Sequence, residues 1–215
     1  MPDPPTRTSH ALTPPRAAAI AGLLFSLLMI ISLGIIRLAF PGVPGEQIPV
    51  NPAFENAIAV ALHLLPFAGL AFLWFIGVLR DRIGAAEDRF FATVFLGSGL
   101  LFVACLFASA AVAGAVLGNT HAPPITSEVY DFARQVCYAF LNIFAIKMAG
   151  VFTFSTCVIA LRTAIFPRWI AFCGFACGLT LLLVISHWLW IVMLFPLWTI
   201  LVSVYILTMK RTSEA

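Results

Sequence analysis

The chain has 215 residues, of which 62% are hydrophobic and only 10% are charged. Soluble domains carry about 25% charged residues, so a water-soluble fold is excluded and the composition predicts an integral membrane protein. The net charge of +3 does not indicate nucleic-acid binding, because the basic residues are dispersed at the ends of apolar segments instead of clustered with aromatic residues.

A proline-rich stretch, residues 1–16, opens the chain and is expected to form a disordered cytoplasmic tail. Six apolar segments follow, and about 20 apolar residues are enough to cross about 30 Å of hydrocarbon. The first segment has no convincing cleavage site, so we expect it to be retained. The sequence therefore predicts a single all-α domain, a polytopic bundle of six transmembrane helices, with a cytoplasmic tail at 210–215. The predicted spans are 17–40, 53–79, 90–118, 129–161, 167–186 and 189–209.

Basic residues alternate between the two ends of the predicted spans. Arg7 and Arg16 precede the first span, three arginines separate the second from the third, two separate the fourth from the fifth, and Lys210 and Arg211 follow the sixth. The other three loops contain no lysine or arginine. This alternation follows the positive-inside rule for an even number of spans with both termini in the cytoplasm. It also supports a turn at "SHW", residues 186–188, which divides the last two spans.

Lys147, in "NIFAIKMAG", is placed by these bounds near the middle of the fourth span, where a charge is costly. At about 100° per residue it points away from Tyr138 and Asn142. Three environments stay open. The lysine could be a structural residue that is deprotonated, hydrated, or bonded to carbonyl and hydroxyl groups freed by a kink. It could meet an anionic or carbonyl-bearing ligand, or it could face a carboxylate of a partner protein.

His63 lies on one stripe of the second span with Asn56 and Trp74. One interpretation is a neutral, hydrogen-bonded interior histidine, and the other is a polar pathway or pocket that opens outward. A haem held by His63 and His187 is an alternative that the sequence does not favour. No other cofactor and no metal site is predicted, since Cys173 and Cys177 lack further ligands.

The outer half of the fourth span is the most polar helix segment. Asp131, Arg134, Gln135, Tyr138 and Asn142 share one broad face, which Thr153 and Thr156 continue inward. If this face is internal, it should mark the interior of the bundle or a wet cavity. An ion-pair cluster is also predicted at the outer end, formed by Glu55, Glu128, Asp131, Arg134 and Arg37.

Small residues predict close helix packing in two spans. The third span has a ridge of Ala104, Ala108, Ala111, Ala115 and Gly118, and the fifth has Gly174 and Gly178 in "GFACG". Either ridge could pack within the bundle or form a homo-oligomer contact. Pro66 and Pro196 each remove a helix hydrogen bond, so kinks are expected in the second and sixth spans.

Three segments carry a resemblance to a known group of proteins. "RAAAIAGLLFSLL", "GVLRDRIGAAEDRFFATVFLGSGLLF" and "FPRWIAFCGFACGL" resemble small polytopic membrane proteins of high-GC, actinobacterial-type bacteria that belong to families of unknown function. The resemblance covers about half the chain. It implies a multi-pass protein of the bacterial inner (plasma) membrane, and it assigns no function to any residue.

Three classes of function remain, all in the lipid bilayer. The first is a non-enzymatic accessory, assembly or regulatory protein with a membrane-protein partner, which is favoured because no P-loop, GxSxG or HExxH motif and no catalytic set is found. The second is a small permease or proton-coupled carrier that uses Lys147 and His63. The third is a membrane redox or lipid-modifying enzyme.

Overall fold

The computed structural model describes residues 14–39, 52–83, 89–117, 126–163, 165–183 and 190–211. Of the predicted tails 1–16 and 210–215, residues 1–13 and 212–215 lie outside these ranges, as do Gly118 and His187, whereas residues 14–16 and 210–211 are helical. The elements are α1 (Pro14–Ala39), α2 (Pro52–Ile83), α3 (Arg89–Leu117), α4 (Ser127–Tyr138), a π-helix η2 (Ala139–Ala145), α5 (Ile146–Thr163), α6 (Arg168–Leu183), a 3₁₀ turn η3 (Ile191–Met193) and α7 (Leu194–Arg211). The all-α fold is confirmed.

Within the described residues, five helices are long and apolar enough to cross a membrane, the continuous helix of α4, η2 and α5 being counted as one. The sixth apolar helix, α6, has 16 described residues, and residues 184–186 of the predicted span 167–186 lie outside the described ranges. Pro66 lies inside α2 as predicted. Pro196 lies near the start of α7, directly after the 3₁₀ turn η3, and the kink expected there stays a prediction.

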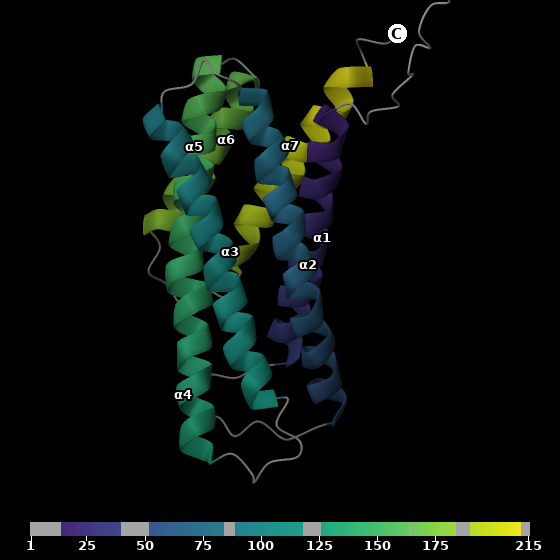
Figure 1. The fold of residues 1–215 in the computed structure, drawn as a ribbon, viewed down its shortest axis with the longest axis vertical. Helices are drawn as coiled ribbons and strands as arrows, with labels where there is room; N and C mark the ends of the chain where they lie inside the picture. The colour runs from purple at the N-terminus through teal and green to yellow at the C-terminus, as the bar shows by residue number, and fades with distance from the viewer. Residues whose placement is uncertain are drawn as a thin grey trace, which may run out of the picture.

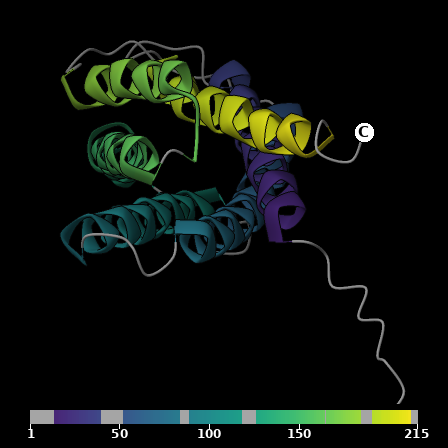
Figure 2. The same ribbon diagram turned by 90° about the horizontal axis from the view of Figure 1, so that it is seen from above.

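The helices form a closed ring, which is visible from above in Figure 2. Neighbours around the ring are α1 and α2, α2 and α3, α3 and the α4–α5 helix, α5 and α6, α6 and α7, and finally α7 and α1. Figure 1 places the start of α1 and the end of α7 at the same end of the bundle. At the opposite end, α4 extends well beyond α6 and α7.

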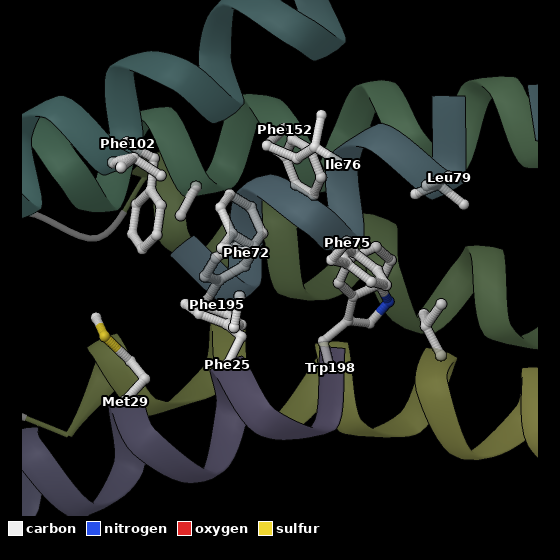
Figure 3. Close-up of a cluster of buried hydrophobic side chains, with 14 of the residues drawn as sticks. Phe25, Met29, Phe72, Phe75, Ile76, Leu79, Phe102, Phe152, Phe195 and Trp198 are labelled. Atoms are coloured by element: carbon white, nitrogen blue, oxygen red, sulfur yellow. The ribbon is translucent and has the colours of Figure 1, made fainter. Parts of the chain in front are cut away.

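Phenylalanine side chains fill the centre of the ring (Figure 3). Phe72 of α2 is fully buried. Its ring centroid lies 4.6 Å from that of Phe25, 5.2 Å from Phe102, 5.1 Å from Phe152 and 5.5 Å from Phe195. These rings come from α1, α3, α5 and α7, so one cluster joins five helices. Most pairs meet edge to face, the geometry that aromatic rings prefer.

Arginines mark the end of the bundle where α2 and α5 finish and where α3 and α6 begin. Arg80, Arg162 and Arg168 are exposed there. The guanidinium carbon of Arg162 lies 4.6 Å from the centroid of the Phe91 ring, a cation–π contact that ties the end of α5 to the start of α3. We call this the basic end of the bundle.

Candidate functional site

The ammonium group of Lys147 faces the C-terminal end of α6. Its Nζ donates hydrogen bonds to the carbonyl oxygens of Leu181, at 3.1 Å, and of Leu182, at 2.6 Å. The last four carbonyls of a helix have no partner within that helix, and the helix dipole places partial negative charge on them. Of the three predicted environments, this geometry matches bonding to carbonyl groups. The carbonyls belong to the last described turn of α6, whereas we had expected a kink to free them.

Two glycines set the distance between α5 and α6. A Cβ atom added to Gly150 would lie 3.1 Å from the carbonyl oxygen of Gly178, and one added to Gly178 would lie 3.1 Å from that of Gly150. The two backbones therefore touch at this level, as small residues in membrane helices allow. Lys147 precedes Gly150 by about one turn, so its side chain reaches the final turn of α6.

The length of the helix that carries Lys147 allows a second estimate of its depth in the membrane. The segment Glu128–Thr163 has 36 residues, about 54 Å at helical rise, which exceeds a hydrocarbon layer of about 30 Å. If that layer begins at Arg162, it ends near Asn142 and leaves α4 outside it. Lys147 then lies in the outer quarter of the layer. This shallower position and the mid-bilayer position expected from the sequence are two predictions for the depth of Lys147, and they differ in whether α4 lies within the membrane.

The π-helix η2 separates the polar face of α4 from the rest of the long helix. A π-helix has i→i+5 bonds and more residues per turn than an α-helix, so the predicted angle between Lys147 and Tyr138 does not hold. Thr153 and Thr156 are buried and donate to the carbonyls of Ala149 and Phe152. Tyr138, in contrast, is exposed. The predicted continuous face is therefore broken at η2.

Side-chain hydrogen bonds supplement the backbone at the start of η2. Ser109 Oγ of α3 donates to the carbonyl of Cys137 at 3.2 Å, and Cys137 Sγ donates back to the carbonyl of Ser109 at 3.3 Å. Asn142 Nδ2 donates to the carbonyl of Tyr138 at 3.3 Å. The Ser109–Cys137 pair links α3 to α4 where the long helix changes its winding.

We expect Ser109→Ala to lower the free energy of unfolding by about 0.6 kcal/mol, the average for a hydrogen bond between membrane helices. Detergent-titrated unfolding in mixed micelles measures this change. Thr208→Val, which removes a hydroxyl that bonds the carbonyl of Tyr205 on its own helix, is the control and should cost less. An equal or larger loss for the control would remove the special role of the α3–α4 pair.

The predicted stripe of α2 lies on the outside of the bundle. Asn56, His63 and Trp74 are all exposed. His63 Nδ1 lies 2.7 Å from the carbonyl oxygen of Ala59 one turn earlier, so the Nδ1–H tautomer can donate to it. The interior position proposed in one of our two interpretations was wrong. The haem proposal remains untested, because His187 lies outside the described residues.

Neither Lys147 nor His63 lines the small cavity near the centre of the described helices. This cavity has about 10 Å³ and is lined by apolar side chains, including Met29, Phe102, Leu141 and Phe195. A cavity of that size is at the lower limit for one water molecule, and an apolar lining offers it no hydrogen bonds. This cavity is therefore not the common polar path that a carrier would need.

The polar residues of α4 lie on the outer surface. Glu128, Asp131 and Gln135 are exposed, and Arg134 is half-buried. Among the described side chains, no ion pair joins Glu128, Asp131 and Arg134. The other two members of the predicted ion-pair cluster, Glu55 and Arg37, have side chains that the structure does not describe. Phe132 is 70% exposed on the same helix. Thr126 caps α4 by accepting a hydrogen bond from the N–H of Val129.

The two small-residue ridges differ in their surroundings. Gly174 and Gly178 are buried: a Cβ on Gly174 would meet Cys157 and Trp198, so this ridge packs against α5 and α7 within the chain. Ala104, Ala111 and Ala115 are exposed, and Ala108 is half-buried. Homo-oligomer formation through either ridge remains a prediction.

The fold and the placement of its polar groups define a polytopic helical membrane protein. Comparison of the chain with protein families, with curated proteins and with solved structures found no match. The resemblance to actinobacterial-type membrane proteins therefore remains a prediction, and the function is argued from the geometry alone.

Proposed function

We propose that this chain is an accessory or regulatory protein of the bacterial inner membrane, with both termini in the cytoplasm, and that it binds a membrane-protein partner through α4. The observation that carries the proposal is the outward position of this amphipathic helix. Its Phe132 side chain is 70% exposed, beside the exposed carboxylates of Glu128 and Asp131.

The surroundings of α4 favour a protein partner. One face of α4 packs on α3, where Ala133 is buried, and the opposite face has no neighbour among the described helices. With a hydrocarbon layer of about 30 Å that begins at Arg162, α4 projects beyond the layer at the end opposite the arginines. An exposed phenylalanine flanked by acidic residues suits a partner that offers an apolar groove and basic side chains.

The interior of the bundle gives less support to a carrier. The five phenylalanines that meet at the centre of the ring leave no polar passage at that level. Lys147 donates hydrogen bonds to α6, and His63 lies on the outer surface of α2. The groups suited to recognising a partner therefore lie on the outer surface of the bundle, and the centre of the bundle is apolar.

Site-specific photo-crosslinking in intact cells tests this proposal. A benzophenone side chain placed at Phe132 or Gln135 should give the same discrete cross-linked product, identified by mass spectrometry as one membrane protein. Phe172 of α6, which is 63% exposed, is the matched control and should give no protein product. Asp131→Lys should weaken the product at position 132. Cross-linking at 132 that equals that at 172, or that is unchanged by Asp131→Lys, would contradict the proposal.

A further inference from the structure

The last turn of α6 concentrates negative potential at one point inside the bundle. The described part of α6 finishes at Leu183, and the carbonyls of its last turn, at the negative end of the helix dipole, lie beside α5. Leu181, which supplies one of these carbonyls, is fully buried, whereas Leu182 and Lys147 are half-buried. Bulk solvent therefore screens the charge less than it would at a fully exposed helix end.

The ammonium group of Lys147 lies within hydrogen-bond distance of these carbonyl oxygens. Lys147 reaches them from a residue 34 and 35 positions earlier in the chain, with Nζ distances of 3.1 and 2.6 Å. The contact is therefore tertiary and does not come from local capping within α6. A compact ammonium group concentrates its charge on one atom with three donors, which suits two adjacent carbonyl oxygens better than a planar guanidinium does.

We infer that the C-terminal end of α6 is a binding site for one primary ammonium ion, that the chain fills this site with its own Lys147, and that a small alkylammonium ion can replace the side chain when it is shortened. The site holds the final turn of α6 against α5. The inference goes beyond the proposed partner binding and does not depend on it.

Chemical rescue of Lys147→Ala tests the site directly. The substitution keeps Cβ and removes the remaining three methylene groups and the ammonium group, so n-propylammonium chloride is the matched probe. The readouts are the unfolding temperature in detergent and hydrogen exchange of the amides at 180–183. We expect exchange there to rise by at least about tenfold in the variant, as for a lost hydrogen bond to a charged group. Added n-propylammonium should reverse most of that rise.

A control salt and a control variant distinguish specific binding of an ammonium ion at this site from a general change in helix packing. Tetramethylammonium chloride at equal concentration has no N–H donor and should not rescue Lys147→Ala. Thr180→Val removes a hydroxyl that bonds the carbonyl of Ala176 on the same helix end, and its stability should not respond to either salt. Equal rescue of Lys147→Ala by the two salts would overturn the inference.

Two further variants keep the test decisive if Lys147→Ala does not fold. Lys147→Gln keeps N–H donors but removes the charge, and Lys147→Met removes both. We expect faster exchange at 180–183 in both, with the larger change for Lys147→Met. Native-like protection of these amides in both variants would show that no cation is needed at the end of α6 and would overturn the inference.

Discussion

Phe72→Ala is expected to lower the free energy of unfolding by about 2–3 kcal/mol, below the usual range of about 3–5 kcal/mol for a buried phenylalanine. The reduction has a physical cause: a membrane helix that separates from its neighbours enters lipid, so the loss is mainly in packing and not in transfer to water. Phe72 touches rings from four other helices, and the cavity would open at the centre of the ring.

Unfolding in mixed micelles measures the effect of Phe72→Ala, with Phe172→Ala as the control. Phe172 is 63% exposed on α6, so its removal should change stability by less than about 0.5 kcal/mol. If the two variants lost equal stability, the phenylalanine cluster would not be the core that joins the helices.

Gly178→Leu should separate α5 from α6 and lower the free energy of unfolding by about 2–3 kcal/mol, as overpacking does in a close-packed interior. A Cβ at this position lies 3.1 Å from the carbonyl oxygen of Gly150 and 3.4 Å from the backbone N of Phe154. Backbone atoms cannot move aside as a flexible side chain can. The substitution should also lengthen the contact between Lys147 and the end of α6, with faster amide exchange at 180–183.

The same substitution at an open glycine provides the control for Gly178→Leu. A Cβ on Gly77 of α2 meets no atom within 4 Å, so Gly77→Leu should change stability by less than about 0.5 kcal/mol. Gly178→Ala should fall between the two leucine variants. A Gly178→Leu protein as stable as Gly77→Leu would contradict the close approach of α5 and α6.

Packing features within a helix were easier to predict than the direction in which a helix faces. The "GFACG" motif predicted a close approach, and Gly178 does touch Gly150. The alanine ridge of α3 carries the same kind of signal, yet Ala104 and Ala111 are exposed. Small residues indicate which face allows close contact, but only the rest of the bundle determines whether a neighbour occupies it.

The polar site was harder to predict because it depends on a helix end and on a change of winding. Lys147 stood out as a charge in an apolar segment, but nothing local indicated that α6 would end beside it, 34 residues later. The π-helix at Ala139–Ala145 has no evident sequence signal, and it changed the face on which Lys147 lies. His63 was assigned to the interior in one interpretation because membrane helices usually turn polar residues inward.

Cysteine accessibility tests most directly whether the interior is sealed and α4 is exposed. In a variant without the five native cysteines, single cysteines would replace Ala68 and Ala149, which are buried, and Gln135, which is exposed. A charged, membrane-impermeant thiol reagent would be applied from both sides of the membrane. We predict rapid labelling at position 135 and none at 68 or 149. Labelling at 149 at a rate close to that at 135 would reveal a water-filled path through the bundle and contradict this account.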